Sequence, residues 1–335
     1  MAIVNGTDPV ALRDAAARLA AGALVAFPTE TVYGLGANAD DDAAVARIYA
    51  AKGRPADHPL IVHLADAGAA GAYAASIGAP ARRLIDAFWP GPLTLIVARR
   101  AGRGLAAAAH QDSIGLRVPA HPVALALLRA AAALGVSGIA GPSANRHGRV
   151  SPTMAAHVEA EFGPGLTVVD GGSCAVGIES TIVDCSRARP ALLRPGQLGR
   201  AAIEAVLGRP LAAPDAASPR APGSLASHYA PAARVELLDA VALRHRLEQP
   251  APPGGARVGV YSRLALTPRG PGDPGSAGSG RLVRVMPDDA AAVAHELFAV
   301  LRGFDAAGVD AIWVERPPPG PAWDGVRDRL QRAAA

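Results

Sequence analysis

A stretch rich in proline, alanine and serine, from residue 210 to about residue 231, divides the 335-residue chain. It has little hydrophobic periodicity, which is typical of a linker. On both sides of it, short apolar runs alternate with longer segments of helical character, as in domains built from layers of helices and strands. We therefore predict two domains, at residues 1–209 and 232–335, joined by a linker at residues 210–231 that could also serve as a lid.

The first domain is predicted to be an α/β domain with a mixed, twisted sheet, because its helices and strands do not follow a strict βαβ order. The predicted helices are residues 10–21, 40–51, 80–88, 122–134, 153–162 and 198–207. The predicted strands are residues 23–27, 60–64, 93–98, 113–118, 137–140, 166–170 and 180–184, with a further short strand ending within residues 192–196. Residues 28–36, rich in hydroxyl groups and glycine, are predicted to form a loop.

The second domain is predicted to be a small, parallel, Rossmann-like α/β domain, because its strands and helices alternate regularly. The predicted strands are residues 235–238, 258–261, 282–285 and 311–314, and the predicted helices are residues 241–247, 288–307 and 322–333. Residues 267–280, rich in glycine and proline, are expected to form a flexible loop.

Composition and charge limit the kind of core, the binding partners and the location that this chain can have. Half of the residues are hydrophobic but only 4% are aromatic, so the core must consist mainly of Ala, Val, Leu and Ile. A net charge of +4 is compatible with nucleotide or RNA contacts without establishing them. Cys174 and Cys185 have neither a CxxC partner nor metal-spaced histidines, so we expect small buried thiols in a reducing compartment. We find neither a signal peptide nor an apolar run of ~18 residues, and expect a cytoplasmic protein without a membrane contact.

Lysine occurs at a single position in the chain, which marks that position as a candidate functional residue. The chain has one lysine, Lys52, and 32 arginines. A compact ammonium group on a flexible stem suits polyphosphate oxygens, which is one reason to retain lysine where arginine prevails elsewhere. Chance survival at a surface position is the alternative. Asparagine is nearly as scarce, and one of the three, Asn145, lies in the loop formed by residues 141–145.

Polar side chains gather in loops next to the predicted strands of the first domain, where α/β proteins commonly bind ligands. They are Thr29, Glu30, Thr31, Tyr33, Lys52, Arg54, His58, His63, Ser113, Arg117, Ser143, Asn145, Ser151, Glu179, Ser180, Thr181 and Arg194. This set favours an anionic ligand with several oxygens, such as a nucleoside triphosphate. The chain has no GxxxxGK[ST], GxGxxG, GxSxG or HExxH motif, so either an unusual nucleotide site or RNA phosphate contacts are compatible with it.

Several of these residues could instead have a purely structural role. Arg117 could be a buried arginine paired with an acid, since buried charges need partners. His58 and His63 could be ordinary histidines. Glu30 could cap a turn or a helix, and Ser180 with Thr181 could close a turn.

Six runs, in this order, resemble the YrdC-like family. They are PTETVYGL at residues 28–35, KGRP at 52–55, GLRVP at 115–119, PSAN at 142–145, ESTIVD at 179–184 and RPG at 194–196. The resemblance covers roughly residues 5–208. Residues 221–223 (APG) and 227–231 (SHYAP) are similar to the linker of the long, two-domain members. The chain has Gly223–Ala226 where many relatives carry a basic, often methionine-bearing stretch.

The resemblance implies an activity. L-threonine, bicarbonate and ATP would give L-threonylcarbamoyl-AMP and pyrophosphate, with Mg²⁺ accompanying ATP. The product would serve N6-threonylcarbamoyladenosine formation in tRNA through a downstream threonylcarbamoyl-transferase complex, and direct contact with tRNA stays open.

The resemblance also implies residue roles. Lys52 and Arg54 would be catalytic, holding the triphosphate and offsetting charge on the leaving pyrophosphate. The remaining ATP-binding residues would be His58, Ser113, Gly141, Ser143, Asn145, Ser151, Arg194 and Tyr229, with Tyr229 as a lid that excludes water. Threonine would be bound by Thr31, His63, Arg117 and Ser180, and no side-chain metal site is expected.

Two other functions stay open. An RNA-binding YrdC-like module without turnover would use Arg146, His147 and Arg149, beside the residue 141–145 loop. A carbamoyl transferase with another acceptor would share the nucleotide chemistry, but such relatives carry additional zinc-finger or acylphosphatase-like modules that this chain lacks.

Overall fold

The computed structural model describes residues 3–223, 228–249, 256–264 and 280–335. The chain forms two compact units. The first consists of Met1–His147 and Ser151–Ser224, and the second of Gly148–Val150 and Leu225–Ala335. Residues 224–227 of the predicted linker and most of the predicted loop at 267–280 lie outside the described residues, and the boundaries at residues 209 and 231 stay predictions.

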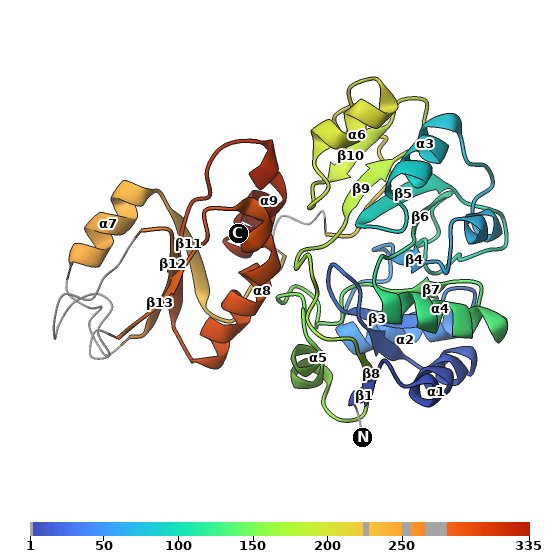
Figure 1. Cartoon of the computed structure of the whole chain (residues 1–335), viewed down its shortest axis with the longest axis horizontal. Coiled ribbons are helices and arrows are strands. Elements are labelled where there is room, and N and C mark those ends of the chain that lie inside the picture. Colours follow the sequence, from blue (N-terminus) through green and yellow to red (C-terminus); the bar gives the residue numbers. More distant parts are fainter. Residues whose placement is uncertain (1–2, 224–227, 250–255, 265–279) are drawn as a thin grey trace. The chain divides into compact units, whose positions relative to one another are not determined.

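A ten-stranded sheet organises the first unit, in the order β1-β8-β2-β3-β7-β4-β6-β5-β9-β10 (Figure 1). The strands are β1 (Ile3–Asn5), β2 (Val25–Phe27), β3 (Gly34–Asn38), β4 (Ile61–His63), β5 (Leu93–Ala98), β6 (Ser113–Arg117), β7 (Ile139–Ala140), β8 (Thr167–Asp170), β9 (Thr181–Asp184) and β10 (Ala191–Arg194). The sheet contains both parallel pairs, such as β4 with β6, and antiparallel pairs, such as β5 with β6. The prediction of a mixed sheet is confirmed.

The α-helices of the first unit begin and end close to the predicted positions. They are α1 (Pro9–Ala20), α2 (Asp42–Lys52), α3 (Ala79–Phe88), α4 (Pro122–Ala133), α5 (Ala155–Phe162) and α6 (Arg200–Leu207), and the 3₁₀ helix η1 (Gly68–Ala72) was not predicted. The carboxylate of Asp41 accepts a hydrogen bond from the Ala44 amide and caps the start of α2. Gly53, in the left-handed region with φ 62°, ends α2 directly after Lys52. Local chemistry therefore places the single lysine at a helix terminus.

Two layers of helices cover different parts of the sheet. Helices α1 and α4 pack over one face with Val25, Phe27, Ile139 and Val169. Residues of α2, α3, α5 and α6 pack against the opposite face. Over β4, β5 and β9, on the same face as Phe27, the cluster of described buried residues consists of Ile61, Ile96, Ile182 and Ala221, and none of them is helical. That part of the sheet is where the candidate site lies.

Strand β3 corrects the sequence prediction, which assigned residues 28–36 to a loop. Gly34–Asn38 pairs antiparallel with β2 and with β7. Glycine is a poor strand former, but a Cβ atom at Gly36 would lie 2.8 Å from Ile139 Cγ2 and 3.0 Å from the Val25 carbonyl oxygen. The close approach of neighbouring strands therefore requires glycine here. Strand β1, which pairs parallel with β8, was also missed.

The second unit contains a four-stranded parallel sheet, as predicted, in the order β11-β14-β12-β13. Its strands are β11 (Arg234–Leu238), β12 (Val258–Ser262), β13 (Arg281–Val285) and β14 (Ala311–Glu315), and its helices are α7 (Ala240–Glu248), α8 (Ala290–Ala306), the 3₁₀ helix η3 (Pro321–Trp323) and α9 (Asp324–Ala333). Leu243 and Leu247 of α7 pack with Val258, Val260 and Trp313.

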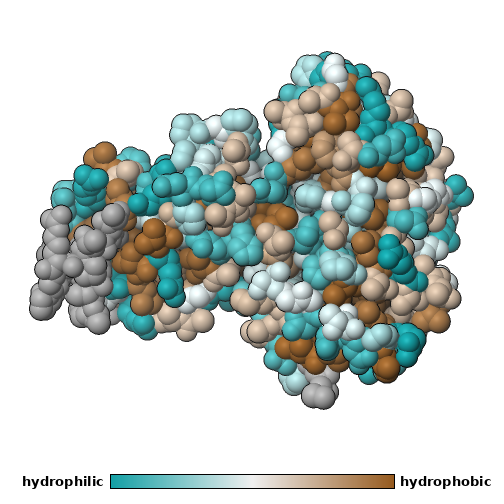
Figure 2. Space-filling view, in the orientation of Figure 1, coloured by the Kyte–Doolittle hydropathy of each residue, from teal (hydrophilic) through white to brown (hydrophobic). Residues whose placement is uncertain are grey.

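The surface is that of an ordinary globular chain. On the face in Figure 2, apolar residues of the first unit are interspersed with polar ones, and the exposed large apolar side chains of that unit are Val10, Leu105 and Leu134. Cys174 is buried and Cys185 is partly buried, both as free thiols. None of the helices in the described part of the chain is long and apolar enough to cross a membrane.

Candidate active site

The register of β4 and β6 brings two predicted threonine-binding residues together. His63 pairs with Arg117, and Ile61 pairs with Gly115, at the parallel β4–β6 interface. Side chains alternate along a strand, so His63, Arg117 and Ser113 all point to the face that carries Ile61. Ser113 begins β6 and Arg117 ends it, which separates them by roughly 13 Å at about 3.3 Å per residue. Ser113 therefore lies at the other end of the strand from the predicted threonine-binding residues.

Arg117 is buried and uses its guanidinium group on three partners. Nη2 lies 2.7 Å from Oε1 of Glu30. Nη1 donates a hydrogen bond to the hydroxyl of Thr31 at 2.9 Å, and Nε donates to the Gly91 carbonyl oxygen at 3.2 Å. Arg117 thus has the acidic partner that a buried arginine requires. That acid comes from the loop that also carries Thr31, so Glu30 does not act merely as a cap.

The loop around Glu30 is shaped by Thr29. Its hydroxyl donates to the Val32 carbonyl oxygen at 2.6 Å and accepts from the amides of Thr31 and Val32. Because the Thr29 proton is used, the 2.8 Å contact between the two threonine hydroxyls has Thr31 as its donor. Thr31 in turn accepts from Arg117. The hydroxyl of Thr31 is therefore held in place both as a donor, to Thr29, and as an acceptor, from Arg117.

His63 is a neutral imidazole in this environment. It is buried, and burial together with the positive charge of Arg117 lowers its pKa to about 3. Its ring stands edge-on to Phe27, with centroids 5.5 Å apart. A Cβ atom at Gly141 would lie 3.2 Å from Nδ1 of His63. Gly141, a predicted ATP-binding residue, thus leaves space next to a predicted threonine-binding residue.

Ser180 and Arg194 are in direct contact, although the sequence analysis assigned them to different substrates. Arg194 donates to the Ser180 carbonyl oxygen from Nε at 3.1 Å and from Nη2 at 2.8 Å, and Nη2 also donates to the Ser180 hydroxyl at 3.1 Å. The Ser180 hydroxyl also lies 2.8 Å from the hydroxyl of Thr94. A predicted threonine-binding residue and a predicted nucleotide-binding residue are therefore in direct contact here.

Lys52 is buried, so its survival at a surface position is excluded. Its side-chain nitrogen donates to the carbonyl oxygen of Ser143 at 2.6 Å and to that of Asn145. Burial, followed by the nearby charge of Arg54, lowers the pKa of Lys52 well below its ordinary value. The amide of His147 donates to the Lys52 carbonyl oxygen at 2.8 Å. The runs KGRP (residues 52–55) and PSAN (residues 142–145) thus meet through Lys52.

The loop that carries Ser143 and Asn145 is fixed by the backbone after Glu30. The Ala144 amide donates to the Tyr33 carbonyl oxygen and the Leu35 amide to the Pro142 carbonyl oxygen, both at 2.8 Å.

Two further predicted site residues, Ser151 and Arg54, have partners that the sequence does not indicate. The Ser151 hydroxyl donates to Oε1 of Glu179 at 2.5 Å, and Nη2 of Arg54 donates to the Pro59 carbonyl oxygen at 3.1 Å. The Glu179 partner was not assigned a role from the sequence, although it directly precedes Ser180.

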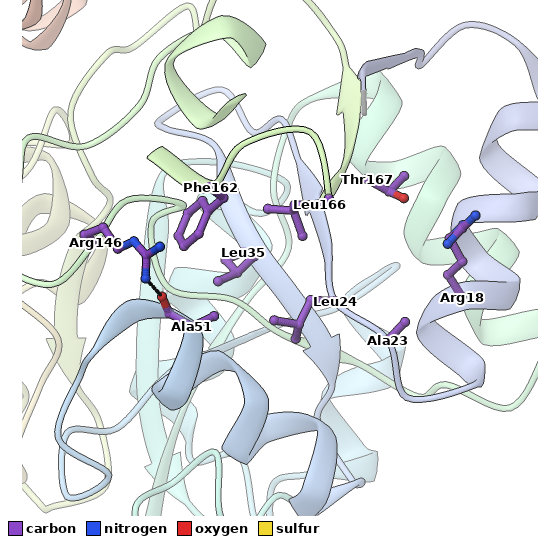
Figure 3. Close-up of a pocket in the computed structure, with 10 residues that line it drawn as sticks. Arg18, Ala23, Leu24, Leu35, Ala51, Arg146, Phe162, Leu166 and Thr167 are labelled. Atoms are coloured by element: carbon purple, nitrogen blue, oxygen red, sulfur yellow. Dashed lines mark hydrogen bonds between the residues drawn. The ribbon is translucent and has the colours of Figure 1, made fainter. Parts of the chain in front are cut away.

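Arg146 fastens the end of α2 to the same loop. In Figure 3 its guanidinium group reaches the Ala51 carbonyl oxygen, to which Nη1 donates at 2.7 Å, and it lies over the Phe162 ring at 5.2 Å. From the sequence, Arg146 is a candidate for RNA contacts only. Arg146 also lines a cavity of about 410 Å³ with Leu24, Leu35 and Leu166. None of the residues assigned to ATP or threonine lines that cavity, which is separate from the candidate site.

The rings of His58 and His147 lie 5.7 Å apart, both half-buried. Burial and then the charge of Arg54 lower the pKa of each. A neutral imidazole at His58 suits a hydrogen bond rather than an ion pair.

Tyr229 belongs to the second unit, and its described ring contacts lie there. The ring stacks on Phe298 with centroids 5.5 Å apart, and the Arg329 guanidinium group lies 5.2 Å from its centroid. The ring is buried. The role of Tyr229 as a lid stays a prediction.

Comparison with known proteins assigns the chain to a family. The family model Sua5_yciO_yrdC, described as "Telomere recombination", matches residues 17–196, and the model "Threonylcarbamoyl-AMP synthase, C-terminal domain" matches residues 198–335. The chain belongs to the Sua5–YciO–YrdC family. Within it, threonylcarbamoyl-AMP synthases from Pyrococcus abyssi and Bacillus subtilis are each 38% identical to it. The first match covers 96% of this chain and 94% of the relative, and the second covers 99% and 96%.

A solved structure in the Sua5–YciO–YrdC family shares the fold of the whole chain. The crystal structure of P. abyssi Sua5 complexed with L-threonine is 37% identical, with a TM-score of 0.87 over 100% of this chain and 98% of that chain. The resemblance to the YrdC-like family, in its long two-domain form, is confirmed. The residue assignments for ATP and threonine stay predictions.

Proposed function

We propose that this protein is a threonylcarbamoyl-AMP synthase, which forms L-threonylcarbamoyl-AMP and pyrophosphate from L-threonine, bicarbonate and ATP. Relatives of nearly equal length carry that name, and one solved relative binds L-threonine. The observation that carries the proposal is the buried single lysine, held between Ser143 and Asn145 in the same unit as the buried Arg117. A buried cation with carbonyl partners and no described ion pair suits an incoming polyanion.

On the threonine side, Arg117 supplies a fork of donors that matches a carboxylate. The Thr31 and Ser180 hydroxyls and the neutral His63 supply the hydrogen bonds for a small polar side chain. All four side chains are buried, so a polar group of theirs that the ligand leaves without a hydrogen bond costs binding free energy. This favours the amino acid that satisfies all of them over its analogues.

On the nucleotide side, Lys52 and Arg54 offset the charge that develops on the leaving pyrophosphate. His58, Ser113, Gly141, Ser143, Asn145, Ser151 and Arg194 bind the rest of the nucleotide, and Tyr229 closes over it. An oxygen of the carbamate group formed on the threonine nitrogen then attacks the α-phosphorus, and the P–O bond to pyrophosphate breaks. The protein acts by positioning and electrostatics, without a covalent intermediate.

Mg²⁺ would enter with ATP. Within the described residues, no group of three or more His, Cys, Asp or Glu side chains is arranged to hold a metal ion. A phosphate-bound Mg²⁺ needs only one or two protein oxygens, and the donor set of Asn145, Ser151 and Glu179 is of the hard-oxygen type that it prefers. When bound, the ion neutralises phosphate charge.

An RNA-binding module without turnover is the second candidate. Arg146, His147 and Arg149 are the basic residues that favour it, but Arg146 is already engaged with Ala51 and Phe162. We further propose that the product serves tRNA modification in the cytoplasm, through a separate threonylcarbamoyl-transferase complex.

Mass spectrometry after incubation with ATP, Mg²⁺, bicarbonate and L-threonine tests the proposal, alongside a pyrophosphate assay. We expect an AMP adduct that depends on both threonine and bicarbonate, with matching pyrophosphate release. Intact ATP, together with tight and strongly salt-dependent RNA binding, would instead support the RNA-binding module.

A further inference from the structure

Glu30 is a buried carboxylate with unused hydrogen-bonding capacity. Its side chain is 10% exposed and lies 2.7 Å from Arg117. The contact is an ion pair without an aligned hydrogen bond, and neither Glu30 oxygen accepts a hydrogen bond within the described residues. Buried carboxylates ordinarily accept several. The carboxylate can therefore accept hydrogen bonds from a ligand that carries N–H donors.

The backbone around Glu30 leaves the side chain little freedom. The Val176 amide donates to the Glu30 carbonyl oxygen at 2.7 Å. The next two amides, of Thr31 and Val32, are both turned to the Thr29 hydroxyl. The carboxylate is thus presented from a fixed loop toward Arg117, within the group of residues assigned to threonine.

Charge balance indicates which ligand completes this arrangement. Arg117 and Glu30 already neutralise each other, so an anion that took Arg117 alone would leave a buried carboxylate unpaired. A zwitterion supplies a partner to both: its carboxylate pairs with Arg117, and its ammonium group gives Glu30 the N–H donors that it lacks. We propose that Glu30 binds the α-ammonium group of the amino-acid substrate and accepts one of its protons, an inference that rests on the proposed function.

The proton transfer prepares the amine for reaction. The ammonium group gives one proton to a Glu30 oxygen, which yields a neutral amine and a carboxylic acid. The amine lone pair attacks the carbon of bicarbonate, an N–C bond forms, and the C–OH bond breaks. The hydroxide leaves with a second amine proton as water, and the carbamate remains. Glu30 later returns its proton to water. While Glu30 holds the proton from the ammonium group it is neutral, and so it does not repel the carbamate as the carbamate forms.

Glu30→Gln tests the inference, because the amide keeps the shape and removes the charge. The affinity for L-threonine is compared with that for its α-hydroxy analogue, in which a hydroxyl replaces the ammonium group, by calorimetry. We expect Glu30→Gln to weaken threonine binding about 100-fold and to change binding of the hydroxy acid less than threefold. Glu204→Gln, which alters a carboxylate paired with Arg200 in the same unit, is the control and should change neither affinity. Unchanged ATP affinity shows that the variants are folded.

Catalysis supplies a second readout. Residual activity of Glu30→Gln should rise about tenfold per pH unit below the pKa of the substrate amine, because the neutral amine must then come from solution. Glu30→Asp should recover part of the activity. Equal weakening of both ligands would reduce Glu30 to a structural brace for Arg117, and wild-type threonine affinity would also overturn the inference. If the wild-type protein prefers threonine through Glu30 yet makes no AMP adduct, the proposed reaction fails while the assignment of Glu30 stands.

Discussion

The side-chain nitrogen of Lys52 lies 2.6 Å from the carbonyl oxygen of Ser143. Through this contact, the end of α2 donates to the loop formed by residues 141–145. Arg146 and His147, which follow the loop, donate in the opposite direction, to the carbonyl oxygens of Ala51 and Lys52. The ammonium group therefore has a defined position before any nucleotide binds.

Replacing Lys52 by arginine should abolish most of the synthase activity. The planar guanidinium fork is larger than the ammonium group and cannot occupy a site bounded by two carbonyl oxygens. We expect kcat/KM to fall about 100-fold or more, a loss of the size seen when a donor to a transition state is removed. Steady-state pyrophosphate release measures it. The matched control is Arg83→Lys on the exposed side of α3, and an active Lys52→Arg protein would contradict the role.

Nucleotide binding should be accompanied by proton uptake. Burial lowers the pKa of Lys52 in the free protein, whereas a triphosphate next to the ammonium group raises it again. Between the two pKa values, the complex holds one proton that the free protein does not hold. Calorimetry of ATP binding in buffers with different ionisation enthalpies should therefore show uptake of up to about one proton. Uptake that persists in Lys52→Met would assign the proton to another group.

Thr31→Val should weaken threonine binding about tenfold and lower the free energy of unfolding by about 1–2 kcal/mol, because the buried Arg117 loses an acceptor. Thr167→Val is a control of the same chemistry, since Thr167 is half-buried in β8 and away from the candidate site. Urea unfolding and threonine titration measure the two effects. Equal behaviour of the two variants would argue against a role for the Thr31 hydroxyl.

His63 should make the fold sensitive to acid. Its pKa is about 3 in the folded chain and about 6.5 when unfolded, so between these values the unfolded chain binds a proton that the folded chain does not. The free energy of unfolding should therefore fall as the pH drops from about 6.5 toward 3, by up to about 1.4 kcal/mol per pH unit. Urea melts over this range should show a shallower dependence for His63→Gln. The exposed His245→Gln should retain the wild-type slope.

Elements set by local chemistry were predictable from the sequence. The Gly53 terminator and the Asp41 cap define α2, and the alternation after residue 232 defines the parallel sheet of the second unit. Strand β3 was not predictable, because its Gly-Leu-Gly sequence has low strand propensity and its pairing with β2 and β7 comes from distant residues.

The composition of the candidate site was predictable, but its pairings were not. Glu30 lies 87 positions before Arg117, and Ser180 lies 14 before Arg194, so each pair comes together only in the folded chain. The predicted division into threonine-binding and nucleotide-binding residues follows from the resemblance. Ser180, assigned to threonine, and Arg194, assigned to the nucleotide, are nevertheless in direct contact. Glu179 and Arg146 acquire their partners only in the folded chain.

The buried single lysine has a practical consequence for anyone who handles this protein. Amine-reactive dyes, surface coupling and lysine cross-linkers have one side chain to modify, and it lies inside the unit that we propose to be catalytic. Labelling at Lys52 therefore measures access to the proposed phosphate-binding region directly. Labels that must not disturb this region should be attached elsewhere, for example at an introduced surface cysteine.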